Sequence, residues 1–256
     1  MKQSRAPQQR VTWKFVLALF LALLTGVFYY LRWSFFSTTS FHSEMLRFFL
    51  GDFAFLFLQV LVVTVFLETY LKRREERAKR QKLNMIIGAF FSETGFELLG
   101  DIADVDANSD ELRRNASPQQ NWNHKDFEQA RLAIANHVPA IQPTTKQLAD
   151  MNILLKEKKK SLLSLLTNQA LLDHESFTDL LWSISHLADE LSARSDFELL
   201  PKTDILHLSV DIERTYGILG LTWLDYLEHL QARYPYLYSL AVRNNPLNPS
   251  CVVEVR

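Results

Sequence analysis

The sequence predicts an all-α protein in which a two-helix transmembrane hairpin is followed by a cytoplasmic α-helical bundle. Two apolar segments within the first 71 residues are each long enough to cross a bilayer as a helix. After them, apolar residues recur at helical spacing, and no segment shows the convincing alternation of a strand. Charge is segregated too: residues 1–82 hold 13 Lys/Arg and 5 Asp/Glu, whereas residues 83–256 hold 15 and 24.

These patterns divide the chain into four expected parts. They are a basic cytoplasmic segment at 1–12, a transmembrane hairpin at 13–71 with helices at about 13–31 and 47–71, a basic helical stalk at 72–82, and a cytoplasmic α-helical domain at 83–256. The acidic charge of the last part argues against nucleic acid as a partner, because phosphate binding needs a positive surface.

Aromatic residues at both ends of the first span resemble the belts found at membrane interfaces, namely Trp13, Tyr29, Tyr30 and Trp33. A cleaved signal peptide is the alternative, since basic residues precede the apolar core. The small residues of a cleavage site are missing, however, and bulky residues follow the core. We therefore expect an uncleaved anchor.

The orientation of the hairpin follows from its flanking basic residues. Four Lys/Arg precede or open the first span, and a longer run follows the second, including Lys72, Arg73, Arg74 and Arg77. Because basic residues favour the cytoplasmic side of a membrane, both termini are expected in the cytoplasm. The expected membrane is a bacterial cytoplasmic membrane. The single Cys251 then lies in a reducing compartment. The basic run is interpreted as an anchor at the lipid surface, with docking to anionic lipid or a partner as the alternative.

Two polar residues, Asp52 and Gln59, fall inside the second span. The favoured interpretation places Asp52 at headgroup depth, where it caps the first turn of the helix; a pore or proton-relay role is the alternative. Gln59 is expected to donate a hydrogen bond to a neighbouring helix in the membrane.

The apolar segment at 83–99 has two interpretations. It either lies in the membrane interface or forms the first core helix of the cytoplasmic domain. The acidic residues between Glu93 and Asp106 would be repelled by an anionic membrane surface, so the core helix is preferred.

The rest of the chain predicts further helices separated by polar or proline-containing breaks. Residues 104–123 are expected to form a loop with at most a short helix, and a helix is expected at 126–137. The next helix should run from Thr144 or Thr145 to 173, and another should start at a capping box at Ser176. A long helix with a bend near Gly217 is expected at 203–233, and Pro235 should open a last short helix.

Three His–carboxylate pairs sit four residues apart on these helices: His186/Glu190, His207/Asp211 and Asp225/His229. This spacing places both groups on one helix face, so two facing helices could assemble a metal site. Helical bundles that bind metals through carboxylates use a Glu-x-x-His motif on two helices. The nearest match in this sequence is Asp204-x-x-His207, and it occurs once. Ion pairs are therefore the favoured interpretation, and no metal is predicted.

No motif of a cofactor-binding protein or an enzyme is present, so we expect neither cofactor nor catalysis. Three functions fit the predicted architecture. The leading one is a membrane-anchored interaction, scaffold or accessory protein with a protein partner or a second copy of itself. The second is a signal transducer that couples the hairpin to the bundle. The third is an oligomeric channel or transporter subunit built around Asp52.

Overall fold

A computed structural model describes residues 19–28, 30–31, 33–34, 41–168, 171 and 174–248. Within these ranges every extended regular element is a helix, and the pairing of β type is one isolated bridge between Asp106 and Ile141. The prediction of an all-helical protein is therefore confirmed for the described part of the chain.

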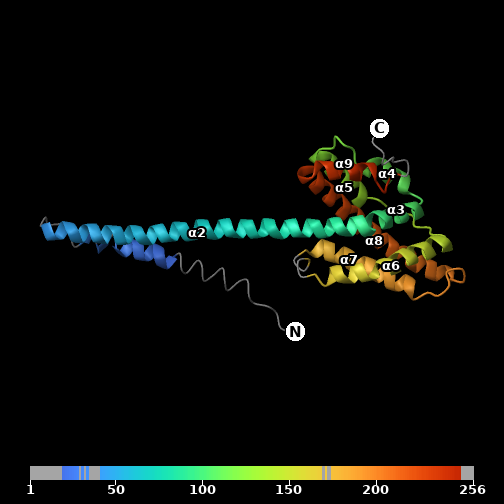
Figure 1. Cartoon of the computed structure of the whole chain (residues 1–256), viewed down its shortest axis with the longest axis horizontal. Helices are drawn as coiled ribbons and strands as arrows, with labels where there is room; N and C mark the ends of the chain where they lie inside the picture. Colours follow the sequence, from blue (N-terminus) through green and yellow to red (C-terminus); the bar gives the residue numbers. More distant parts are fainter. Residues whose placement is uncertain are drawn as a thin grey trace. The chain divides into compact units, whose positions relative to one another are not determined.

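The chain forms two compact units, Met1–Ala78 and Lys79–Arg256. The first apolar helix covers Leu19–Phe28. The remaining helices, labelled in Figure 1, are α2 (Phe41–Phe90), the π-helix η1 (Phe91–Gly95), α3 (Phe96–Val105), α4 (Ser109–Ala116), α5 (His124–Ala135), α6 (Thr145–Leu166), α7 (Glu175–Ser192), α8 (Lys202–Arg233) and α9 (Pro235–Arg243).

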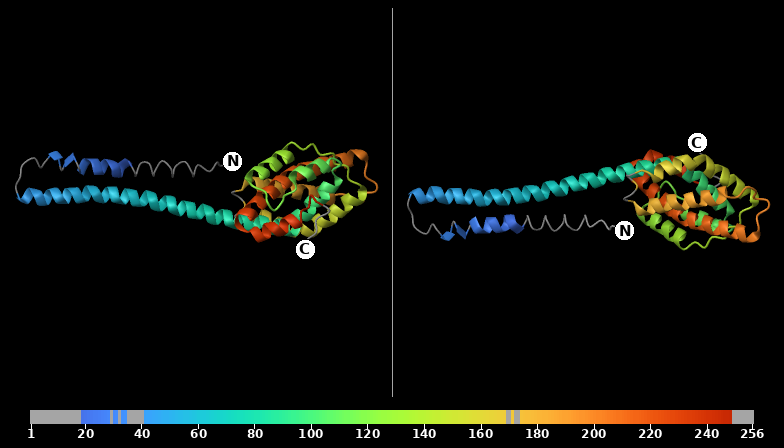
Figure 2. Two further views of the ribbon diagram at one scale, coloured as in Figure 1. Left: turned by 90° about the horizontal axis from the view of Figure 1, so that it is seen from above. Right: turned by 90° about the horizontal axis from the view of Figure 1, so that it is seen from below.

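The first unit contains two helices that contact each other through aromatic rings. The ring of Phe28 lies 5.5 Å from that of Phe57 and 6.1 Å from that of Phe53, measured between ring centroids. Both views in Figure 2 show the helix at Leu19–Phe28 beside α2. The end of one helix thus packs against the early part of the next.

One stretch of the described residues, Gly51–Val105, contains a helical window long and apolar enough to cross a membrane. None of this window is buried by the protein, and most of its large apolar side chains between Phe53 and Leu71 are exposed, with Phe57 and Leu61 partly buried. The continuous part of the first helix that the structure describes, Leu19–Phe28, is apolar and by itself shorter than a full span.

In the second unit, α8 is the central helix (Figure 1). It packs against α7 on one side, with α6 behind α7, and against α5 and α9 on the other, with α4 beside α5. One continuous core of apolar side chains joins these helices, and its largest member, Trp223 of α8, is fully buried. This arrangement explains why the segment at 203–233 is apolar on most of its sides.

The segment at 83–99 packs into this core, as preferred from its sequence. Its buried apolar residues are Leu83, Ile87, Phe90, Phe91, Leu98 and Leu99. The π-helix η1 connects α2 to α3 and buries Phe91, whose ring stacks on Tyr226 of α8 at 5.3 Å. A π-turn of this kind is found mostly as a short insertion between α-helical segments.

Local capping fixes several helix ends, and two predictions about them are wrong. Thr144 begins α6 with a reciprocal capping box to Gln147, as expected. The helix ends at Leu166 rather than at 173; Thr167 is its C-cap residue, and the Thr167 hydroxyl donates to the carbonyls of Leu163 and Ser164 in the last turn. The expected capping box at Ser176 is also absent: α7 already begins at Glu175, and the Ser176 hydroxyl bonds to His174 Nδ1 instead.

Asp106 joins the turn after α3 to the loop before α6. Its fully buried carboxylate accepts hydrogen bonds from the backbone N–H groups of Asn108 at 3.0 Å and Ala140 at 2.8 Å. The other carboxylate oxygen lies 2.6 Å from His137 Nε2. This polar contact positions the chain between α5 and α6 against the core.

Candidate functional site

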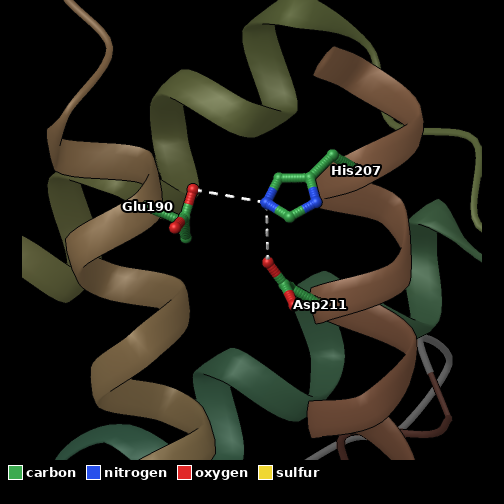
Figure 3. Close-up of side chains that lie close together, drawn as sticks. All are labelled: Glu190, His207 and Asp211. Carbon is green, nitrogen blue, oxygen red and sulfur yellow. Dashed lines mark ion pairs between the residues drawn. The ribbon is translucent and has the colours of Figure 1, made fainter. Parts of the chain in front are cut away.

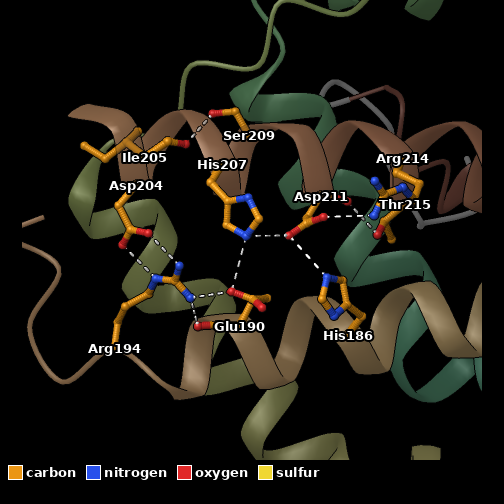
Figure 4. Close-up of polar contacts among 10 residues, drawn as sticks. All are labelled: His186, Glu190, Arg194, Asp204, Ile205, His207, Ser209, Asp211, Arg214 and Thr215. Atoms are coloured by element: carbon orange, nitrogen blue, oxygen red, sulfur yellow. Dashed lines mark hydrogen bonds and ion pairs between the residues drawn. The ribbon is translucent and has the colours of Figure 1, made fainter. Parts of the chain in front are cut away.

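Two of the predicted His–carboxylate pairs face each other across the contact between α7 and α8. His186 and Glu190 belong to α7, and His207 and Asp211 belong to α8. The buried stripes of both helices hold them in place, since Leu187 of α7 and Leu208 of α8 are fully buried beside them. Figure 4 shows the four polar side chains converging between the two helices.

The four side chains approach one another through three contacts. His207 Nε2 lies 3.4 Å from Glu190 Oε2 and 3.6 Å from Asp211 Oδ2 (Figure 3). His186 Nε2 lies 3.5 Å from the same Asp211 oxygen. All three distances exceed the ordinary range of a hydrogen bond between nitrogen and oxygen.

Asp211 is the most buried member of this group, with only 4% of its side chain exposed. Its Oδ1 accepts a hydrogen bond from the Arg214 guanidinium at 3.0 Å. Its Oδ2 is buried and has no hydrogen-bond partner. A buried carboxylate oxygen without a partner is costly, so this atom needs an explanation.

Arg194 organises the outer edge of the cluster. It forms two parallel hydrogen bonds to Asp204, at 2.8 and 2.6 Å, and donates to Glu190 Oε2 at 2.8 Å. It also donates to the backbone carbonyl of Glu190. The hydrogen bonds from this guanidinium lower the pKa values of the Glu190 and Asp204 carboxyls, so both are ionised at neutral pH.

The third predicted pair does not share a site. Asp225 accepts a hydrogen bond from Arg131 at 2.8 Å, whereas His229 bonds to the amide of Asn84 at 3.1 Å. Burial and the nearby Arg233 lower the pKa of His229. The relation Asp204-x-x-His207 also fails as a shared pair, because Asp204 is held by Arg194.

The structure describes some of the residues that were predicted to lie at or in the membrane. Tyr30 and Trp33 are exposed, as are Lys72, Arg73, Arg74 and Arg77 on α2; Trp13 and Tyr29 lie outside the described residues. Asp52 and Gln59 are exposed side chains of α2. Because α2 already begins at Phe41, Asp52 lies inside the helix, and its expected role as a cap of the first turn is wrong.

Arg194 is the member of the cluster that the sequence analysis did not single out. It follows Glu190 by four residues, as Glu190 follows His186, and lies just beyond the C-terminal end of α7, where its guanidinium reaches back to Glu190. This repeated four-residue spacing is the signal in the sequence that could have added Arg194 to the candidate residues.

The fold and the site together define a helical protein of two domains with a polar cluster between two helices of the second. Family models place the chain more closely. Residues 79–243 match the family described as "Uncharacterized protein MJ1433, C-terminal helical domain", and residues 8–71 match "MJ1433, N-terminal helical domain". The chain belongs to this family.

A relative from Methanocaldococcus jannaschii, named Uncharacterized protein MJ1433, is 38% identical over 240 residues. The aligned region covers 93% of this chain and 95% of the relative. No solved structure matches the chain. The two family models leave residues 72–78 between them, inside the segment predicted as a basic stalk.

Proposed function

We propose that this protein is a membrane-anchored scaffold or accessory protein without catalytic activity. In this proposal a two-helix hairpin at 13–31 and 47–71 lies in the bilayer, and the C-terminal helical domain binds a protein partner in the cytoplasm. The observation that carries the proposal is the band of exposed apolar side chains on α2 from Phe53 to Leu71, followed directly by basic residues. Such a long exposed apolar band is unfavourable in water.

Two further observations support a hairpin in lipid. The contacts of Phe28 with Phe53 and Phe57 bring the two apolar helices together. The hydroxyls of Thr25 and Thr69 donate to the carbonyls four residues earlier, at 2.9 and 2.8 Å. A hydroxyl satisfied within its own helix is compatible with an environment that offers no water.

The proposed partner is a protein that contacts the helical domain. Exposed apolar side chains on that domain, including Trp182, Leu199 and Leu206, offer contact area on an otherwise acidic surface. Aromatic and aliphatic anchors of this type supply much of the energy in protein interfaces.

Labelling of single cysteines tests the anchor and its orientation. Cys251 is the chain's single cysteine, so Cys251→Ser provides a background into which Ser37→Cys is introduced. A membrane-impermeant maleimide should label Ser37→Cys in intact cells, and should label native Cys251 only after permeabilisation. Labelling of Cys251 in intact cells would show that the C-terminus faces outward and that the proposed orientation is wrong. Release of the protein from membranes by an alkaline wash would refute the anchor.

Purification of the full-length protein in a mild detergent, followed by mass spectrometry, tests the partner. A stoichiometric companion from native membranes supports an accessory or scaffold role. The exposed Trp182→Ala and Leu199→Ala changes should reduce its recovery, while the buried core keeps the domain folded. A homo-oligomer with no companion would instead favour a self-assembling hairpin.

A signal transducer is the second candidate, and the length of α2 favours it. This single helix contains both the exposed apolar band and the buried residues Leu83 and Ile87. A continuous helix can transmit a rotation or a shift along its axis. Disulfide crosslinking of cysteines placed between Arg77 and Lys82 should then change its pattern with lipid composition or membrane potential. A pattern that stays constant would argue against this function.

A further inference from the structure

We propose that Glu190, His207 and Asp211, with His186 beside Asp211 as a further donor, form a binding site for a divalent transition-metal cation of the zinc class. The proposal goes beyond the anchoring function and does not depend on it. It rests on three observations: the donor set, the spacing of the donor atoms and the unpartnered buried oxygen of Asp211.

The donor set suits a borderline cation rather than magnesium or calcium. His207 Nε2 lies beside one carboxylate oxygen each of Glu190 and Asp211, and His186 Nε2 lies beside the same Asp211 oxygen, so each helix supplies one His and one carboxylate. Imidazole favours zinc and its first-row neighbours, whereas magnesium and calcium favour sites built of oxygen alone. Pairs at i and i+4 on facing helices present both donors toward the space between the helices.

The three contacts among these side chains are longer than hydrogen bonds and fall in the range of distances between neighbouring ligands of one metal ion. With ligand bonds of about 2.0–2.2 Å, neighbouring ligand atoms of a tetrahedral zinc site lie about 3.3–3.6 Å apart. The three contacts measure 3.4, 3.5 and 3.6 Å. The ligand atoms of Glu190, His207 and Asp211 all lie within 4.8 Å of one another.

The same molecule supplies an internal comparison. His137 and Asp106 form a hydrogen-bonded pair at 2.6 Å, and His124 and Glu228 form another at 2.6 Å. Where this fold builds a direct His–carboxylate pair, the two atoms are thus much closer than in the cluster between α7 and α8. The wider cluster leaves room for a cation among the atoms.

Asp211 Oδ2 gives the cluster its independent evidence of a ligand. This oxygen is buried, lacks a hydrogen-bond partner and is approached by the Nε2 atoms of both His186 and His207. A cation bound there would satisfy it. Its second oxygen is already oriented by Arg214, as ligating carboxylates are in known metal sites.

The charges around the site are also compatible with a divalent ion. The two carboxylates of Glu190 and Asp211 would balance its charge, while Arg194 forms a bidentate pair with Asp204. Arg194 also donates to Glu190 Oε2, so this oxygen would be shared between the guanidinium and the metal. About half of each His side chain is exposed, which gives an ion a path from solvent.

Zinc titration of the full-length protein in detergent, after treatment with a chelator, tests the site. We expect one equivalent of Zn²⁺ per chain and an increase in the melting temperature. Removing a residue that only orients a metal ligand lowers the affinity for the metal by about 10–100-fold. Removing a ligand itself should cost more, so His207→Ala should bind zinc at least about 100-fold more weakly than the wild type. Because His207 is half exposed, this change leaves the core intact.

His124→Ala is the matched control, since His124 is an exposed histidine paired with a carboxylate elsewhere on the domain. It should bind zinc like the wild type. Substitution of Co²⁺ gives a second readout, because the intensity of its visible absorption reports four-coordinate geometry, and His207→Ala should lose that signal. Wild-type protein that takes up no zinc, or equal weakening by His207→Ala and His124→Ala, would overturn the proposal.

Discussion

Among single residues, Asp106 carries a large share of the local structure between α3 and α6. Its carboxylate satisfies two backbone N–H groups and His137 from a fully buried position. Buried donors left without a partner cost about 1–3 kcal/mol each.

We therefore expect Asp106→Ala to lower the free energy of unfolding by about 2–4 kcal/mol, measured by chemical denaturation. Asp106→Asn is the control, because its amide oxygen can still accept from the backbone N–H groups of Asn108 and Ala140. It should cost clearly less than the alanine change. Equal losses in the two variants would mean that the backbone contacts contribute little.

Asp101 predicts a pH dependence of stability. Its burial, reinforced by the negative charges of Glu97, Asp104 and Asp150, raises the pKa of its carboxyl to about 6. Because the folded protein holds this proton more tightly than the unfolded chain does, the group's contribution to stability falls as the pH rises from about 4 to about 6.

Asp101→Asn removes this penalty. At pH 7 it should raise the stability by about 1 kcal/mol, a value reduced from the full shift because water reaches the half-buried carboxyl. The gain should shrink as the pH falls and disappear below about pH 3, where the carboxyl is protonated in both the folded and the unfolded state. Melting curves of both proteins across this range measure the difference, and a gain that does not vary with pH would exclude the carboxyl as its source.

The candidate site was predictable from the sequence only in part. The spacing places His186 with Glu190, and His207 with Asp211, on shared helix faces. Whether two such faces meet depends on how α7 and α8 pack, which no local pattern contains. The identical spacing of Asp225 and His229 leads to separate partners, Arg131 and Asn84, for this reason.

At the scale of helices, periodicity predicted the elements well, and their ends less well. The predicted helix at 203–233 is α8 to within one residue, and Pro235 opens α9 as expected. The end of α6 was placed seven residues too late, because the apolar spacing continues past Leu166 whereas the backbone leaves the helix at Thr167. A helix end depends on local hydrogen bonds that apolar spacing does not register.

Two glycines inside helical segments predict opposite effects of the same substitution. A Cβ on Gly95 would lie 2.6 Å from Phe91 Cδ1 and 2.8 Å from Phe90 Cε1, and both rings are buried. A Cβ on Gly217 of α8 would meet no atom within 4 Å.

Gly95→Ala should therefore destabilise the protein by about 1–3 kcal/mol, since a filled core resists an added methyl group. Gly217→Ala should stabilise it by about 0.5–1 kcal/mol through helix propensity alone. Thermal unfolding of both variants in parallel tests the pair. Stabilisation by Gly95→Ala would mean that the two rings move aside at little cost.

At the scale of the whole molecule, the second unit has a hydrophobic core of its own. Among the residues that the structure describes, every buried member of its hydrophobic cluster lies at or after Leu83. The second unit begins at Lys79, and the family model of the C-terminal domain begins at the same residue. The described core residues thus all belong to the second unit.

We expect a fragment of residues 79–256 to be soluble and helical, and to unfold in a single cooperative transition, as measured by circular dichroism. A fragment starting at residue 91 is the control: it lacks Leu83, Ile87 and Phe90, each of which is buried. It should aggregate or melt at a much lower temperature, because several large core side chains are lost. Aggregation of the longer fragment would show that the first unit is required for folding.

The π-helix η1 has a consequence for where insertions and deletions can occur within this family. Each residue of an α-helix adds a rotation of about 100° about the axis, so one inserted residue turns everything on one side of it relative to the other. The wide turn from Phe91 to Gly95 absorbs such a rotation within the helical backbone. A relative with one residue fewer at this point could form an ordinary α-helical turn here and keep the apolar faces of both flanking helices on the core, so gaps in sequence alignments should fall here rather than in α2 or α3.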